Sequence, residues 1–541
     1  MMWKPALAAC AWLLLAHAAA PPAALPPIGA PRSQPAPRRL RGEAALVRAY
    51  DFILDARFDQ VEAELRRACD DDPPALAEDG ARATRATTAP APPEACDVLE
   101  ATALWWRIQL DPGSRALDPA FTAAVERAIR TSEAWTERTP LEAEAWFYLG
   151  GAYAARVQWR VLREEKLAAA RDGKRIKEAL EQALDLDPSL DDAYFGLGLY
   201  KYYADVAPTA AQVLRFLLLL PGGDREEGLR EMLRARERGR LLQGEADYQL
   251  HIVYLWYERQ PGRALELLRR LQRRFPGNPL FAAQIAHVQD AYEHDLIASL
   301  DTWRSLLAGA HEQRVNAAVL AEVQARLGIA RLLEAVYQTD HAIEQLEAIA
   351  AMKPQAPYSA HAQALLRLGE AHDRLGARAA ASTAYRAAIA AAPRDDPFDV
   401  RGQATERLRR GPSAARAEAY RRSLNGWRSL EQNDLSSALA ELRRSLELDA
   451  NDPVARYRYG RVLQALRQDE PALEQYRLAM KHARACPAPI LGNTHLEAAR
   501  LHERAGRREE AIGGYHSAAT LFGAAAETRS AAQRALERML K

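Results

Sequence analysis

Residues 366–393 read LRLGEAHDRLGARAAASTAYRAAIAAAP and contain two amphipathic segments of helical period. Small residues stand where two helices would cross, at Gly369 in the first segment and at Ala381 and Ala388 in the second. Small side chains let helix backbones approach closely, and Pro393 cannot continue a helix. The stretch therefore predicts a hairpin of two antiparallel helices that ends at Pro393.

The same signatures recur along the chain. The second-helix pattern A-x3-Y-x2-A occurs at Ala381/Tyr385/Ala388, Ala472/Tyr476/Ala479 and Ala511/Tyr515/Ala518. A first-helix pattern, W-x2-L-G-x2-Y, occurs at Trp146, Leu149, Gly150 and Tyr153. Looser copies lie at 264–276, 342–354 and 438–450. One hairpin cannot bury its apolar face alone, so several copies in register predict a stack.

These signatures resemble the tetratricopeptide repeat (TPR) family along most of residues 43–525, most clearly at 141–200, 360–393 and 419–520. The resemblance implies an all-α fold, a right-handed α-solenoid with a concave groove. Abundant alanine, leucine, arginine and glutamate, with almost no strand-type alternation, also indicate an all-α chain. Residues 194–240 are similar to a eukaryotic TPR family of the mitochondrial outer membrane and inclusion-body clearance, which adds no catalytic residue.

The resemblance also implies which side chains face the groove, because positions 2, 5, 9, 12 and 13 of each first helix do so in the family. In that register the groove receives Phe195, Leu199, Tyr202, Tyr203, Gln249, Val253, Trp256, Tyr257, Trp427 and Tyr457. Aromatic residues are enriched in binding surfaces. Our leading hypothesis is a partner-binding strip at Tyr202, Tyr203, Trp256 and Tyr257; the alternative is that these rings pack between helices. The Lys/Asn clamp of some TPR domains is not visible, which disfavours a receptor for chaperone tails.

The N-terminus, MMWKPALAACAWLLLAHAAA, has the form of a secretory signal. Lys4 precedes an apolar run, and Ala16-His17-Ala18 is a small-x-small cleavage site. We expect a bacterial protein exported to the periplasm, the cell envelope or the medium. Two alternatives stay open: an uncleaved anchor, and a lipoprotein modified at Cys10.

Cysteine usage agrees with export. Cys69 and Cys96 flank a Pro/Ala/Thr-rich insert that cannot form a core, and in an oxidising compartment they could pair. The alternative is two unpaired buried thiols. Cys486 has no evident partner.

These patterns give a division of the chain. We expect a signal peptide at 1–20, a Pro/Ala/Arg-rich linker at 21–42, an N-terminal TPR-like array at 43–395 with a disordered insert at about 71–94, a linker or single helix at 396–418, and a C-terminal TPR array with a capping helix at 419–541.

The chain carries no recognised catalytic or cofactor motif. Signatures of zinc proteases, serine hydrolases, P-loops and dinucleotide folds are missing from it. His287, Asp290 and His294 share one helical face, but their spacing suits a solvated face better than a metal site. The net charge is +1, and glutamates interrupt the arginine clusters, which disfavours nucleic acid. We expect no cofactor and no metal.

The sequence therefore predicts a non-catalytic scaffold that binds a protein or peptide in its groove. One alternative is an envelope-associated assembly factor that touches lipid through residues 213–221, within LRFLLLLPGGDREEGL (214–229). In TPR register this stretch is a joint between helices, with Asp224 capping the second. Another alternative, which we disfavour, is a helical enzyme with an unrecognised site.

Overall fold

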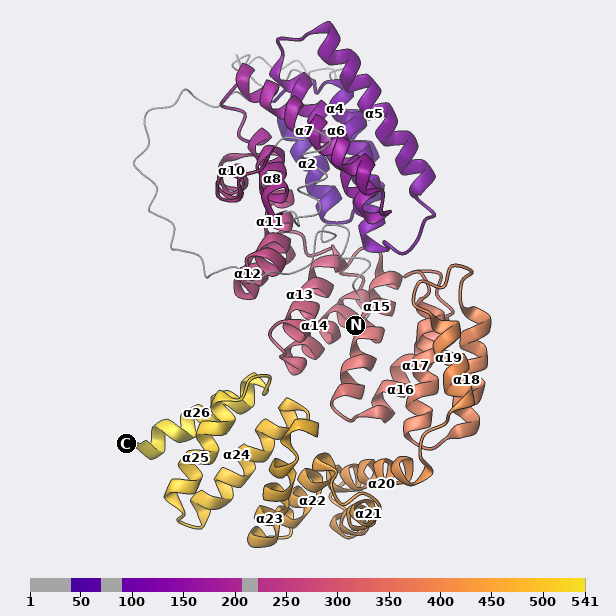
Figure 1. Cartoon of the computed structure of the whole chain (residues 1–541), viewed down its shortest axis with the longest axis vertical. Coiled ribbons are helices and arrows are strands. Elements are labelled where there is room, and N and C mark those ends of the chain that lie inside the picture. The colour runs from indigo at the N-terminus through magenta and orange to yellow at the C-terminus, as the bar shows by residue number, and fades with distance from the viewer. Residues whose placement is uncertain (1–39, 70–89, 207–221, 541) are drawn as a thin grey trace, which may run out of the picture. The chain divides into compact units, whose positions relative to one another are not determined.

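The computed structural model describes residues 40–69, 90–206 and 222–540, which are helical and contain no strand. They form two compact units, Met1–Phe281 and Ala282–Lys541, each a stack of antiparallel helix pairs (Figure 1). The predicted all-α solenoid is confirmed. The signal peptide, nearly all of the linker that follows it, most of the insert and the 213–221 segment lie outside the described residues.

The helices of the first unit are α2 (Glu43–Leu54), α3 (Phe58–Cys69), α4 (Pro93–Leu110), α5 (Asp118–Arg138), α6 (Ala143–Leu162), α7 (Lys166–Leu186), α8 (Ala193–Val206), α10 (Arg225–Arg238), α11 (Gln243–Ile252), the π-helix η1 (Val253–Tyr257) and α12 (Pro261–Arg274). Helix α13 (Pro279–Ala291) spans the boundary.

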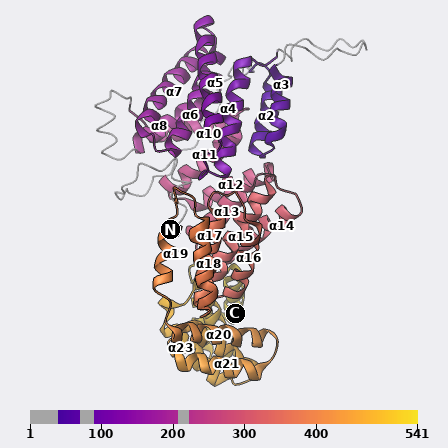
Figure 2. The same cartoon turned by 90° about the vertical axis from the view of Figure 1, so that its right-hand side faces the viewer.

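The helices of the second unit are α14 (Leu296–His311), α15 (Ala318–Ala335), α16 (Thr339–Met352), α17 (Ala360–Arg374), α18 (Arg378–Ala391), α19 (Val400–Arg409), α20 (Ala414–Glu431), α21 (Leu435–Leu448), α22 (Pro453–Ala465), α23 (Asp469–Lys481), the short 3-10 helix η2 (Ala483–Ala485), α24 (Ala488–Arg504), α25 (Arg508–Thr520) and α26 (Ala526–Leu540). Consecutive helices from α15 to α18 contact one another and run side by side (Figure 2).

A glycine in the first helix of a pair meets a tyrosine ring of the second. A Cβ added to Gly369 would lie 2.5 Å from Cε1 of Tyr385, and one added to Gly460 would lie 2.5 Å from Cε1 of Tyr476. Both tyrosines are fully buried. The small residue is therefore required because the large ring fills the crossing.

Each of these tyrosines also fixes its hydroxyl on the first helix. Tyr385 donates to Asp373 at 2.9 Å, and Tyr476 donates to Gln464 at 2.7 Å. Tyr515 makes the equivalent contact with Glu503 at 2.5 Å. In all three pairs the acceptor stands twelve residues before the tyrosine. The ring thus packs while its polar end is satisfied.

The other signature residues also lie inside the pairs. Ala381, Ala472 and Ala511 are fully buried, and Leu149 and Tyr153 are 7% and 3% exposed. A Cβ on Gly150 would meet Leu180 at 2.7 Å, Trp146 donates its indole N–H to the carbonyl oxygen of Pro140 at 2.9 Å, and Pro393 follows the end of α18.

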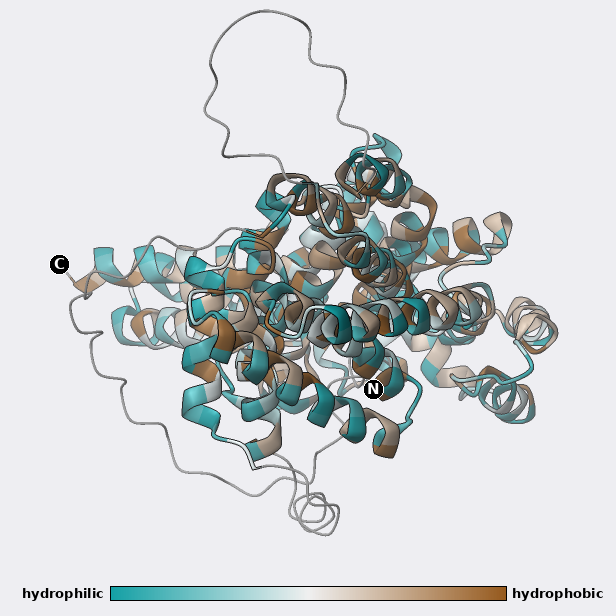
Figure 3. Cartoon of the chain, turned by 90° about the horizontal axis from the view of Figure 1, so that it is seen from above, coloured by the Kyte–Doolittle hydropathy of each residue, from teal (hydrophilic) through white to brown (hydrophobic). Residues whose placement is uncertain are grey.

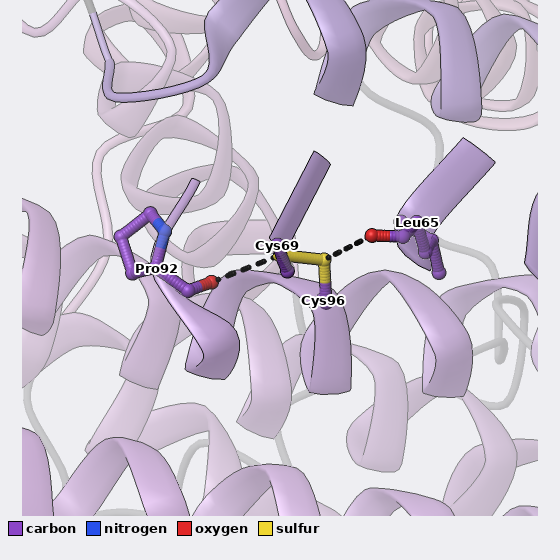
Figure 4. Close-up of a disulfide and its surroundings, with 4 residues drawn as sticks. All are labelled: Leu65, Cys69, Pro92 and Cys96. Atoms are coloured by element: carbon purple, nitrogen blue, oxygen red, sulfur yellow. Dashed lines mark hydrogen bonds between the residues drawn. A yellow bond between two sulfur atoms is a disulfide. The ribbon is translucent and has the colours of Figure 1, made fainter. Parts of the chain in front are cut away.

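Cys69 and Cys96 form a disulfide, with Cα atoms 6.5 Å apart (Figure 4). It joins the last residue of α3 to the first turn of α4 across 27 positions. The two sulfur atoms lie 3.3 Å from the carbonyl oxygens of Pro92 and Leu65. Closing a loop of that length contributes roughly 3–4 kcal/mol in the chain-entropy account.

The start of α10 and the division between the two units can be compared with what the sequence predicts. Asp224 caps α10 as expected, accepting the backbone N–H of Glu227 at 2.8 Å. The compact units divide at Phe281, and residues 396–418, expected to be a linker or a single helix, lie within the second unit. The single helix of that stretch, α19, packs on α17 and α18, with Val400 and Ala404 fully buried. This burial keeps the stretch inside the second unit.

Most helices carry both apolar and polar residues (Figure 3), and the buried residues are mainly apolar. In the described part of the chain, no helix combines the length and apolar character needed to cross a membrane.

The helix crossing can be tested with two alanine substitutions. Gly460→Ala places a Cβ against Tyr476, so we expect the free energy of unfolding to fall by about 1–3 kcal/mol through overpacking. Gly513 in α25 has no atom within 4 Å of such a Cβ, so Gly513→Ala should stabilise by about 0.5–1 kcal/mol. Urea denaturation followed by circular dichroism measures both, and equal effects would contradict the crossing argument.

Candidate functional site

A buried carboxyl group joins three helices of the first unit. Glu245 of α11 is 4% exposed. The Tyr50 hydroxyl and the Trp106 indole N–H each donate to its Oε2 at 3.1 Å, and the Gln249 amide donates to Oε1 at 3.1 Å. Burial raises the pKa of Glu245, and the three donors partly offset this. Helices α2, α4 and α11 are thus joined through one side chain.

The surroundings of Glu245 are packed by the unit's own residues. Trp106 lies 4.8 Å from Tyr248 between ring centroids. The Gln158 side-chain oxygen accepts hydrogen bonds from Trp105 and from Gln249 at 3.1 and 3.0 Å. Gln249 and Val253, which TPR register assigns to a groove, are 1% and 0% exposed. Here the inner faces of the helices form a core.

Three tyrosines of the predicted strip come together beside this core. Tyr257, in the π-helix η1, lies 5.9 Å from Tyr202 and 5.4 Å from Tyr203 between ring centroids, and Tyr202 lies 5.8 Å from Tyr203. All three contacts are edge-to-face, the favoured aromatic geometry. π-Helical turns are rare in proteins, but those that occur are often found at functional sites. Trp256 lies in the same turn and is partly exposed.

The residues of this strip differ in how exposed they are. Tyr202 is fully buried and donates to Glu258 at 2.5 Å, while Arg225 donates to both oxygens of Glu258. Burial and the Glu258 carboxylate raise the pKa of Tyr202. Tyr203, Trp256 and Tyr257 are partly exposed. Phe195, near the start of α8, is buried.

The two predicted aromatics of the second unit pack together. Trp427 of α20 and Tyr457 of α22 have ring centroids 6.1 Å apart, and Tyr457 lies 6.2 Å from Tyr476. Trp427 is partly exposed, and Tyr457 is 6% exposed. Helices α20 and α22 contact each other, as do α22 and α24. Trp427 therefore offers a ring on a face shared by first helices of successive pairs.

Arginines accompany this aromatic pair. Arg461, one turn along α22, donates to the Tyr457 hydroxyl at 3.2 Å and is partly exposed. Arg458 is 3% exposed, donates to Ser423 at 2.9 Å and to the carbonyl oxygen of Tyr337 at 2.7 Å, and lies over Trp427. The motifs in the sequence did not single out these arginines, although α22 reads PVARYRYGRVLQA, with three arginines and no acidic residue.

The three residues considered as a metal site have separate partners. His287 packs on Trp303, Asp290 pairs with Arg331 at 2.7 Å, and His294 packs on Phe522. Burial lowers the pKa of His287 to about 3. In residues 40–69, 90–206 and 222–540, no group of three or more His, Cys, Asp or Glu side chains is placed to hold a metal ion.

No protein-family model and no curated protein matches this sequence. Solved structures do match. A tetratricopeptide repeat protein from Parabacteroides merdae is 13% identical and covers 55% of this chain and 99% of its own, with a TM-score of 0.26. The human IFIT1 dimer with m7Gppp-AAAA is 16% identical over 80% of each chain, with a TM-score of 0.31. A Rap protein complexed with competence and sporulation factor is 12% identical over 92% and 99%, with a TM-score of 0.33.

The fold is a TPR-like solenoid. The glycine–tyrosine crossing and the hydroxyl contact twelve residues back repeat within the chain itself. With identities of 16% or less and TM-scores of 0.33 or less, the three solved structures carry no argument about what this chain binds.

The raised pKa of Glu245 gives a testable pH dependence. The pKa of a glutamate in the unfolded chain is about 4.3. When the pKa in the folded state is higher, the free energy of unfolding falls as the pH rises from the unfolded pKa to the folded one. The Glu245→Gln variant has no ionisable group at this position and does not lose stability in this way. Its free energy of unfolding, relative to that of wild type, should therefore be more favourable at pH 8 than at pH 4. Thermal unfolding at both values measures it. Glu266→Gln, at an exposed site in α12, is the control; a difference independent of pH would contradict a buried ionisable Glu245.

Proposed function

We propose that this protein is a non-catalytic scaffold, exported from a bacterial cell. It binds a protein or peptide on the face shared by helices α20 and α22 of its second unit. The observation that carries this is the partly exposed Trp427 held against Tyr457. A large rigid ring at a fixed place buries much area on binding at little cost in side-chain entropy.

Rigid display is the mechanism. The Tyr457 ring packs against Tyr476. Tyr476 in turn packs on Gly460 and donates a hydrogen bond to Gln464 of the same helix pair. The surface is therefore formed before the partner binds. Most of the conformational entropy lost on binding is then lost by the partner segment. The partly exposed Tyr203 and Trp256 offer a second surface on the first unit.

Export is supported by two features of the N-terminal half. The first is the signal-like sequence of residues 1–20. The second is the disulfide between Cys69 and Cys96. Disulfides persist in oxidising compartments and are rare in the cytosol. The proposed location is the periplasm, the cell envelope or the medium.

The binding surface is tested by substitution. We expect Trp427→Ala to lose capture of a partner, identified by mass spectrometry, from a periplasmic extract, because the anchoring ring is gone while its partly exposed site tolerates truncation. Phe522→Ala, which removes a 65% exposed ring of the same unit, should capture normally. Thermal unfolding checks that both variants are folded.

A Tyr203→Ala/Trp256→Ala variant examines the first unit in the same assay. Loss of capture there, with Trp427→Ala unaffected, would move the site to the tyrosine strip. Full capture by all of these variants would contradict an aromatic binding surface.

Thiol counting tests export. The chain has four cysteines, Cys10, Cys69, Cys96 and Cys486. If residues 1–20 are removed and the disulfide forms, the denatured protein should label at Cys486 alone without reductant, and at three sites after reduction. Mass spectrometry of maleimide-labelled protein reads both numbers. Free thiols at Cys69 and Cys96 in protein taken from its native cell would contradict an oxidising location.

A further inference from the structure

Helix α22 carries three arginines and no acidic residue. Arg456 donates to Gln475 and to the carbonyl oxygen of Ala450. Arg458 donates to Ser423 and a carbonyl oxygen, and Arg461 donates to a tyrosine hydroxyl. Among the described residues, none of the three arginines forms an ion pair with a carboxylate. Their acceptors are all neutral.

Several arginines on the neighbouring helices have carboxylate partners. Arg422 pairs with Glu441 at 2.9 Å, Arg428 with Asp340 at 2.6 Å, Arg500 with Glu497 at 2.7 Å, and Arg504 with Asp469 at 2.9 Å. Arg443 of α21 is an exception, since it donates to the Tyr459 hydroxyl of α22 at 3.0 Å. Arginines without a carboxylate partner therefore gather on α22 and beside it. A guanidinium held among neutral acceptors retains capacity for a carboxylate, its geometrically matched partner.

Nearby acidic groups are already engaged. Glu497 of α24 accepts from Gln464 and from Arg500. Its charge also acts on Arg461: burial lowers the pKa of that arginine, but Tyr457 and Glu497 raise it overall. Asp452 caps the N-terminus of α22 by accepting two backbone N–H groups. Arg461 is the arginine on this face that is both partly exposed and adjacent to the aromatic pair.

We propose that the face formed by Trp427, Tyr457 and Arg461 recognises an acidic segment of a peptide or protein, with one of its carboxylates paired to Arg461. This inference rests on the proposed function and names the chemistry of the partner. The Trp427 indole packs against an apolar side chain of the segment, and the buried Arg458, which lies over the same ring, adds positive potential. A phosphate polymer is a poorer fit, because it requires a run of accessible cations and the chain is nearly neutral.

A display library of random dodecapeptides, selected on the full chain, tests this. We expect the selected peptides to be enriched in Asp and Glu beside an aliphatic or aromatic residue. A selected acidic peptide should bind Arg461→Gln at least about tenfold more weakly by fluorescence anisotropy, the loss expected for one charge-assisted hydrogen-bonded pair. Its Asp/Glu→Asn/Gln counterpart should bind wild type and Arg461→Gln equally.

Arg444→Gln is the matched control, since Arg444 lies on the second helix of its pair and bonds to Glu447; it should bind like wild type. Arg461→Lys keeps the charge without the planar fork and should recover part of the affinity. Circular dichroism establishes that each variant is folded.

The outcomes separate the two proposals. Selected peptides without acidic enrichment, or acidic peptides insensitive to Arg461→Gln, would overturn the acidic-segment inference and leave the scaffold proposal standing if Trp427→Ala still abolishes binding. Failure to select any peptide would overturn both. Tight binding of an oligo-dT strand that Arg461→Gln weakens equally would also overturn the acidic-segment inference.

Discussion

The close crossing of the two helices in each pair governs the rest of this structure. Where Gly369 or Gly460 lies against a tyrosine ring, the helix axes approach as far as side chains allow. The ring then fills the space that the missing side chain leaves, and its hydroxyl bonds to a polar group on the first helix. Because neither helix buries its apolar face alone, each pair requires the next one, and a solenoid results.

The same stacking has different consequences in the two units. In the first, the inner faces meet around Glu245, and tyrosine, tryptophan and glutamine side chains fill the interior. A buried carboxyl group in such a place contributes less to stability than to a fixed arrangement, since its donors come from three helices. In the second unit, the face shared by α20 and α22 keeps Trp427 partly exposed. Binding chemistry is therefore better supported there.

Charge adds what shape alone does not provide. The net charge of the chain is +1, and most arginines near α22 are neutralised by a neighbouring helix. Arg458 and Arg461 bond instead to a serine, a backbone carbonyl and a tyrosine. Burial lowers the pKa of Arg458, the expected effect where desolvation is not fully compensated by negative charge. In the function proposed here, selectivity depends on these two arginines, neither of which is hydrogen-bonded to a carboxylate among the described residues.

The sequence by itself determined the all-α fold and the repeat, because the small residues, tyrosines and helix-ending prolines of a TPR-like pair act through local spacing. It also placed Tyr202, Tyr203 and Tyr257 near one another, since register along two helices suffices for that. Only the tertiary structure decided that Tyr202 and Gln249 are buried, that residues 396–418 pack inside a unit, and that the α22 arginines lack carboxylate partners. Burial and ion pairing depend on which distant helices meet, and helical periodicity carries no information about that.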